Sequence, residues 1–216
     1  DKHLNVGQTQ FRIPETIDLT NKKAIVSSIQ SGCLTREGHR LRIEFLRQAS
    51  NEISEIFHLY GRENYHDLSI YQGPIENKAK AFTEYKYYFM AESESYDNYA
   101  TEKIWEPILC ESLCFYWGCP NLGDYIPEKA FVRLDLHDIE GSLQIVRKAV
   151  SENWWEERLP YIQEAKRLFY SKYGFFAVIN SIISGSIVSQ DEQIGMTIYY
   201  IPHETTVFYA GHDIHG

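Results

Sequence analysis

The chain has 216 residues, of which 44% are hydrophobic, 24% charged and 14% aromatic, a composition typical of a globular protein and not of a disordered or fibrous one. That length fits one full-sized domain, but not two large α/β domains side by side. Thirty acidic against 21 basic residues give a formal charge of −9. Such a balance argues against nucleic acid as a partner, although it leaves room for one local anion pocket.

No targeting or membrane signal is evident in the sequence. No apolar run approaches the ~18 residues of a membrane span, and residues 1–10 are too polar for a signal peptide. The chain has few cysteines and no Asn-x-Ser/Thr acceptor, so we expect a cytoplasmic protein. Cys110, Cys114 and Cys119 fall in an apolar helix-to-strand stretch, where buried free thiols are expected rather than a zinc site.

An alternation of strand and helix patterns organises the chain from residue 23 onwards. Short apolar runs rich in β-branched and aromatic residues predict strands at 24–28, 56–60, 85–91, 113–117 and 130–134. Apolar residues in helical spacing predict helices at 36–50, 101–112 and 139–151. This alternation predicts an α/β fold with a doubly wound, Rossmann-like parallel sheet, in which 85–91 is a central strand because it is apolar on both faces.

The remaining segments are less regular. Residues 1–22 form a polar lead-in segment, and 153–184 predict a long helical stretch that is interrupted at Pro160 and Gly174. Residues 185–216 form a C-terminal extension with a possible hairpin, whose strands are 196–201 and 205–209. Pro107 is expected to bend the helix at 101–112.

Lys103 marks a candidate anion site. In an open α/β sheet, ligands bind at the carboxyl ends of the strands, where the next helix offers free N–H groups. A lysine in the first turn of the helix at 101–112 opposes the helix macrodipole. Two interpretations stay open, an external anion such as phosphate and a solvated lysine.

The same region carries a family resemblance. Tyr85-Lys86 is followed by Glu92, by the block Tyr99-x-Thr101-Glu102-Lys103 and by the run Tyr116-Trp117-Gly118-Cys119-Pro120. Together these motifs resemble the donor-binding half of the α1,3/4-fucosyltransferase family, particularly its bacterial-type members. Segments 25–28, 38–45 and 59–62 come in the family's order, and the resemblance covers roughly residues 22–184.

The resemblance implies the C-terminal, donor-binding half of a GT-B glycosyltransferase. Such an enzyme transfers fucose from GDP-fucose to a glycan hydroxyl with inversion, without an obligatory metal and with no cofactor besides the sugar nucleotide. By resemblance, Lys103 holds the diphosphate and Glu102 the ribose hydroxyls, while Tyr99 lines the nucleotide pocket. A second cation is Arg40 or Arg42. Glu92 belongs to the donor loop, and Ser93 stands where the family has Asn.

Several alternatives remain open. The Ser93 departure leaves room for a UDP-sugar donor such as UDP-xylose. The family's catalytic base lies in an acceptor domain, which residues 1–22 are too short to form. We therefore name no base and expect a separate acceptor-side domain or chain, with 1–22 as its possible remnant, or else a nucleotide-binding module that is inactive alone. No metal site is expected. The paired carboxylates Glu92 and Glu94 are interpreted as solvated, and a C-terminal cluster as unoccupied, namely His203, His212, Asp213 and His215.

Overall fold

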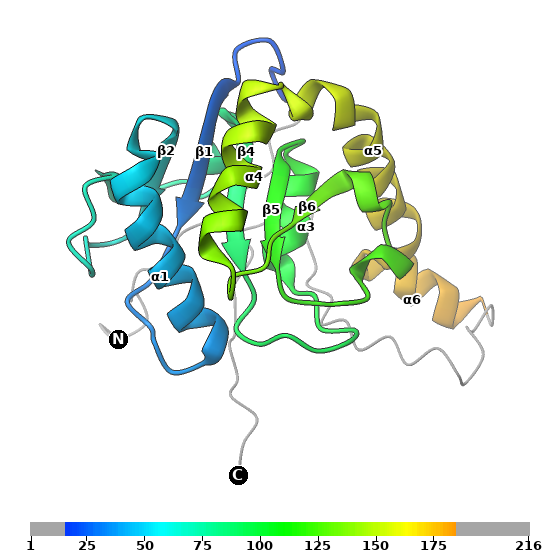
Figure 1. Cartoon of the computed structure of the whole chain (residues 1–216). Helices are drawn as coiled ribbons and strands as arrows, with labels where there is room; N and C mark the ends of the chain where they lie inside the picture. Colours follow the sequence, from blue (N-terminus) through cyan, green and yellow to red (C-terminus); the bar gives the residue numbers. More distant parts are fainter. Residues whose placement is uncertain (1–15, 185–216) are drawn as a thin grey trace, which may run out of the picture.

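The computed structural model describes residues 16–184, and within them the chain forms one parallel α/β sheet with helices on both faces (Figure 1). The strand order is β3-β2-β1-β4-β5-β6, and every neighbouring pair is parallel. The strands are β1 (Lys23–Ile29), β2 (Phe57–Tyr60), β3 (Tyr71–Gly73), β4 (Tyr85–Ala91), β5 (Leu113–Trp117) and β6 (Phe131–Arg133). The helices are α1 (Glu37–Glu52), α2 (Lys80–Thr83), α3 (Glu102–Leu109), α4 (Ile139–Ser151), α5 (Trp154–Leu168) and α6 (Phe175–Ile183).

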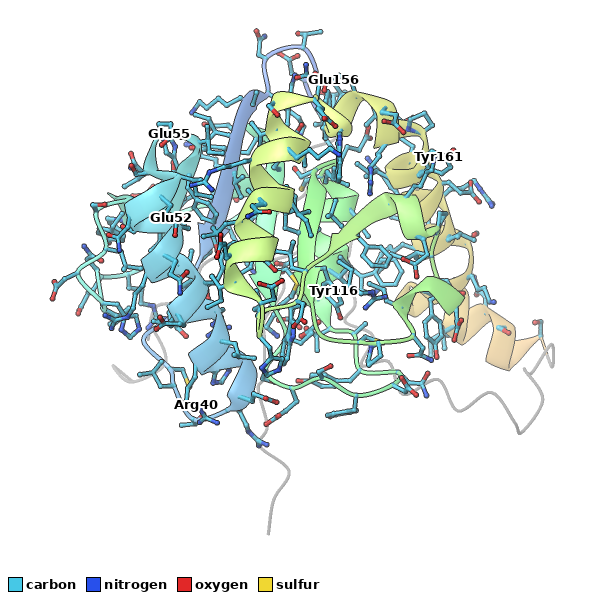
Figure 2. All side chains as sticks on the ribbon, viewed as in Figure 1. Arg40, Glu52, Glu55, Tyr116, Glu156 and Tyr161 are labelled. Atoms are coloured by element: carbon cyan, nitrogen blue, oxygen red, sulfur yellow. The ribbon has the colours of Figure 1, made fainter. Side chains whose placement is uncertain are left out.

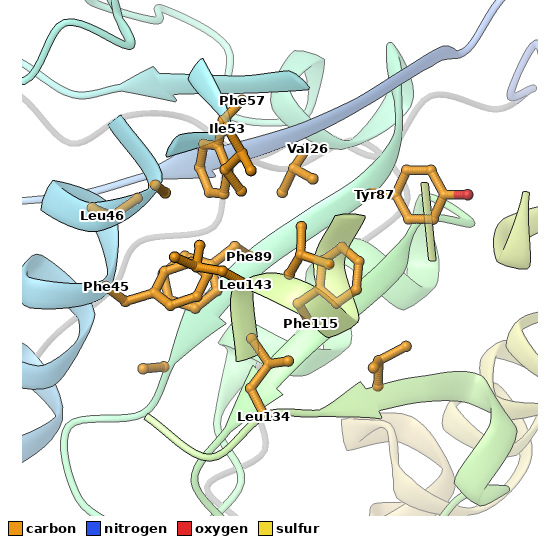
Figure 3. Packing of buried hydrophobic residues seen from close by; sticks show 14 of the residues in the cluster. Val26, Phe45, Leu46, Ile53, Phe57, Tyr87, Phe89, Phe115, Leu134 and Leu143 are labelled. Atoms are coloured by element: carbon orange, nitrogen blue, oxygen red, sulfur yellow. The ribbon is translucent and has the colours of Figure 1, made fainter. Parts of the chain in front are cut away.

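Two hydrophobic cores, one on each face, hold these layers together. On one face, α1 and α4 cover the sheet, and Phe45 of α1 stacks on Phe89 of β4 with 4.3 Å between the ring centroids (Figure 3). On the other face, α2, α3 and the end of α5 pack against the alternate side chains of the same strands, such as Tyr88 and Tyr116. Burial on both faces explains why β4 and β5 are almost continuously apolar.

The predicted doubly wound sheet is confirmed. The strands at 85–91 and 113–117 and the helix at 139–151 agree with the structure to the residue, and the others differ only at their ends. The sequence patterns missed β3 and α2, which have three and four residues and are too short to display a period.

The expected break of the long helical stretch at Pro160 is wrong. Helix α5 runs through Pro160, which lies on the exposed side of the helix, where water can satisfy the carbonyl group that proline leaves without a donor. The interruption comes later, in a π-helical turn at Phe169–Tyr173 that ends at Gly174 as expected. Similarly, α3 continues through the buried Pro107 and ends at Leu109, three residues before the predicted end.

Residues 16–22 are part of the folded unit. The side chain of Lys22 is only 5% exposed, and its Nζ donates hydrogen bonds to the carbonyl oxygens of Phe82, Tyr85 and Cys110 at 2.8–3.1 Å. The predicted hairpin at 196–201 and 205–209 and the histidine cluster near the C-terminus lie outside the described residues.

Residues 16–184 also bear on the expectations about cysteines, metal sites and membrane-spanning helices. Cys110, Cys114 and Cys119 are buried free thiols, as predicted. Between residues 16 and 184, no group of three or more His, Cys, Asp or Glu side chains is arranged to hold a metal ion. In that range, no helix is both long and apolar enough to cross a membrane.

Candidate functional site

A cavity of about 520 Å³ lies at the carboxyl ends of β1 to β4. The chain leaves β1 towards β2 through α1 on one face, and leaves β4 towards β5 through α3 on the other face. This divergence opens a crevice between the two strands, which is where doubly wound sheets bind their ligands. Its walls come from the loops after β1, β2 and β3, together with the first turns of α1 and α3.

Arg42 is the most informative side chain of this cavity. It lies on the buried face of α1, is only 6% exposed and lines the cavity wall. Its Nε is fully buried without a hydrogen-bond partner, and no ion pair with another described residue is formed. Burial lowers the pKa of Arg42, against the opposing effect of Cys33, Tyr88 and Glu92, but a guanidinium stays charged at any physiological pH. A buried cation without a partner is a strong indication of an anionic ligand.

Lys103 also lines the cavity, but carboxylates of the protein itself neutralise its charge. Its Nζ lies 3.3 Å from Oε2 of the fully buried Glu92 and 3.5 Å from Oε1 of Glu102. Burial lowers the pKa of Lys103, but the Glu92 and Glu102 carboxylates outweigh burial and hold it above its usual value. Glu92 also accepts hydrogen bonds from the backbone and side chain of Thr101, which caps α3, so it fixes the start of that helix beside the cavity.

The cavity wall is cationic although the chain as a whole carries a charge of −9. Arg42, Arg62, Lys78 and Lys103 line it, and Glu102 is the carboxylate among the lining residues. Lys78 is paired with Glu106, a buried carboxylate of α3 that lies behind the wall. Burial raises the pKa of Glu106 to about 7. Fixed cations around a concave site of this size suit a compact, multiply charged anion.

The sequence-predicted site residues fall into two groups. Arg42, Glu102 and Lys103 line the cavity together. Arg40 lies exposed on the outer side of α1, where its Nη1 donates to the backbone carbonyls of Leu34 and Thr35 (Figure 2). Of the two arginines that the sequence left open, only Arg42 therefore faces the cavity.

The other predicted residues stand beside the cavity without lining it. Glu92 is fully buried and forms an ion pair with Lys103, so the interpretation of this carboxylate as solvated is wrong. The hydroxyls of Ser93 and Tyr99 are hydrogen-bonded to each other at 2.7 Å, and Tyr99 stacks on the exposed Tyr96 with centroids 4.6 Å apart. These two side chains therefore form the rim next to the start of α3.

Sequence reasoning missed several lining residues, among them His39, Lys78 and Tyr65. Lys78 and Tyr65 lie in irregular segments that flank β3, and nothing in the pattern placed these loops over the cavity. His39 carried a detectable signal, because it lies three residues from Arg42 on the helix that also supplies that cation.

Comparisons with known proteins agree with this architecture. The family model described as glycosyltransferase family 10 (fucosyltransferase) C-term matches residues 19–153. No curated protein matches the chain by sequence.

Among solved structures, an α1,3-fucosyltransferase with GDP-fucose is similar at 19% identity and a TM-score of 0.50, covering 68% of this chain and 46% of its own. TarM is similar at 15% identity and a TM-score of 0.56, and the match covers 79% of this chain and 36% of TarM. A third similar structure is a mutant of S. aureus TarM in complex with fondaparinux, α-GlcNAc-glycerol and UDP. Its identity is 16% and its TM-score 0.54, and the match covers 80% of this chain and 36% of the mutant. At these identities the likeness concerns the fold, and this chain spans less than half the length of each of these proteins.

Proposed function

This chain belongs to glycosyltransferase family 10, and from that premise we propose that its cavity binds the donor of a glycosyl transfer, with GDP-fucose as the donor. The sugar would be transferred to a glycan hydroxyl with inversion at the anomeric carbon. One observation supports the proposal above all. Arg42 is buried in the wall of the cavity between β1 and β4, and its Nε has no hydrogen-bond partner within the described residues.

The chemistry of the leaving group explains why cations are needed. When the glycosidic bond to the nucleotide breaks, negative charge accumulates on the diphosphate, so positive groups aimed at it stabilise the transition state more than the ground state. Arg42 and Lys103 would supply that charge without a metal ion. Glu102 provides carboxylate oxygens that can accept hydrogen bonds from two neighbouring ribose hydroxyls.

Catalysis also needs an acceptor site and a base. In our proposal these come from a separate acceptor-side domain or chain, because the solved fucosyltransferase is more than twice as long as the part that this chain matches. The base would deprotonate the acceptor hydroxyl as it attacks the anomeric carbon in line. Without that part, the chain is expected to bind the donor and to hydrolyse it at most slowly.

Calorimetry with GDP, GDP-fucose, UDP and a UDP-sugar tests the proposal. We expect the GDP compounds to bind and the UDP compounds to bind more weakly. Binding of UDP but not of GDP would reassign the donor to a UDP-sugar such as UDP-xylose. Absence of binding to all four compounds would refute a donor site in this cavity.

Two arginines of α1 provide a matched pair of variants. Arg42→Met should weaken GDP binding by about 10- to 100-fold, the effect of losing charge-assisted hydrogen bonds to a phosphate. Arg40→Met removes the same group from an exposed position two residues away and should leave the affinity unchanged. Equal effects of the two substitutions would show that only overall charge matters.

A further inference from the structure

His39 stands at the third position of α1, in the turn that begins the helix. Its Nδ1 accepts a hydrogen bond from the backbone N–H of Arg36 at 3.3 Å, in a capping-box arrangement. The Cys33 thiol and the Thr35 hydroxyl lie 3.3 and 3.4 Å from the same nitrogen, and both can donate to it. Because Nδ1 is an acceptor here, the neutral ring must carry its proton on Nε2.

The second ring nitrogen is free to meet a ligand. His39 lines the same cavity as Arg42 and Lys103, and its Nε2 has no hydrogen-bond partner among the described residues. Burial, together with the charges of Arg42, Lys103 and Arg36, lowers the pKa of His39 to about 4 against the opposing effect of Glu94. At neutral pH the imidazole is therefore an uncharged donor.

We propose that the Nε2–H of His39 donates a hydrogen bond to the diphosphate of the bound nucleotide, as a third donor beside Arg42 and Lys103. This inference rests on the proposed function, because it assumes that the cavity holds a diphosphate. The helix cap selects the tautomer that presents a donor to the cavity. A neutral donor also adds a contact to the anion without adding a further like charge to a wall that already carries four cations.

Two substitutions separate ligand binding from helix capping. In His39→Asn, the amide oxygen can replace Nδ1 as the acceptor of the Arg36 N–H, but nothing reaches the position of Nε2. In His39→Gln, the longer side chain can keep the capping contact, since glutamine is a natural capping-box residue, and its amide can donate at about the former Nε2 position. Both variants should fold with circular dichroism spectra and melting temperatures close to those of the unchanged protein.

The probes are inorganic pyrophosphate and GDP in calorimetry. We expect His39→Asn to lower the affinity for both ligands by about 10-fold or more. His39→Gln should keep most of the affinity of the unchanged protein. Unchanged affinity in His39→Asn, or an equal loss in both variants, would overturn the role of Nε2. If Arg42→Met weakens binding as expected in that case, the proposed donor site stands while this inference fails. If the unchanged protein binds neither probe, both fail.

A measurement on the unchanged protein gives an independent test that does not depend on the folding of variants. Long-range ¹H–¹⁵N spectra at neutral pH should show His39 as the Nε2–H tautomer, and pyrophosphate should shift its Nε2 resonance. An Nδ1–H tautomer, or an Nε2 signal that pyrophosphate leaves in place, would overturn the inference.

Discussion

Replacing Arg42 by methionine is expected to stabilise the ligand-free fold, although most core substitutions destabilise. Arg42 is only 6% exposed, its Nε has no hydrogen-bond partner, and it forms no ion pair with any residue in the range 16–184. The unliganded protein therefore bears the cost of desolvating a cation without a compensating partner. Methionine keeps an unbranched apolar stem of similar length and removes that cost.

The expected magnitude follows from the burial and from the cavity. An unsatisfied buried polar group costs about 1–3 kcal/mol, and a fully buried unpaired charge several kcal/mol more. Arg42 lines a cavity that is large enough to hold water, and a guanidinium is more weakly hydrated than an ammonium group. The cost of an unsatisfied polar group therefore applies here, and not that of a fully buried charge. Arg42→Met should raise the free energy of unfolding by about 1–2 kcal/mol. For a chain of this length, that is a rise of roughly 2–8 °C in Tm.

The assay is thermal and urea unfolding of both proteins, with and without GDP. Without ligand the methionine variant should be the more stable protein. With GDP at about 100 times the Kd of the unchanged protein, that protein gains about 2.7 kcal/mol. A variant that binds about 10- to 100-fold more weakly gains only about 0.4–1.4 kcal/mol, so its stability advantage should shrink by about 1.3–2.3 kcal/mol. Arg40→Met serves as the control and should change stability by less than about 0.5 kcal/mol. A ligand-free Arg42→Met protein that is destabilised by more than about 1 kcal/mol would refute the view of Arg42 as an uncompensated cation.

Further outcomes concern the neighbours of Arg42. Lys103→Ala should weaken GDP binding by about 1.5–3 kcal/mol in calorimetry and also lower stability, because it strips the buried Glu92 of its cation. Gly38→Ala should cost about 1–3 kcal/mol or more in urea unfolding, since its Cβ would overlap the Glu92 carbonyl oxygen. Gly123→Ala meets only the flexible end of an exposed glutamate and should cost far less. His39 has a pKa of about 4 in the fold against 6.5 when unfolded, so its contribution is complete above pH 6.5 and falls as the pH drops towards 4. His39→Asn should flatten that decline in unfolding experiments across this range.

The central elements of the fold could be predicted because sequence and structure are linked there by burial. β4 and β5 are apolar on both faces since helices cover both sides of the sheet, and α4 shows a clear helical period. Pro160 misled the prediction because a proline on the exposed side of a helix, which is otherwise held by buried residues such as Trp155 and Ile162, does not end that helix. In such a segment, the packing of buried side chains decides whether the helix continues more than the helix propensity of a single residue does.

Lys103 lines the cavity, but its contacts differ from both interpretations that the sequence leaves open. From the sequence, a lysine in the first turn of α3 indicates either an external anion or a solvated side chain. In the structure the buried Glu92, eleven residues before Lys103 along the chain, forms an ion pair with it. That contact depends on how the end of β4 meets the start of α3, and no local pattern encodes it. The buried cation that does lack a partner is Arg42, within the residues that the structure describes.

The choice between Arg40 and Arg42 could have been made from helical geometry. Residues two apart on a helix point about 200° away from each other, so the two arginines cannot share one face. Phe45 and Leu46 mark the side of α1 that meets the sheet, and Arg42 precedes them by three and four residues, which places it on their side. A cation in phase with the core stripe is rare, because burial of an unpaired charge destabilises the fold. Its presence on α1 is best explained by selection for binding, and that explanation is what the opposite responses of stability and affinity in Arg42→Met would test.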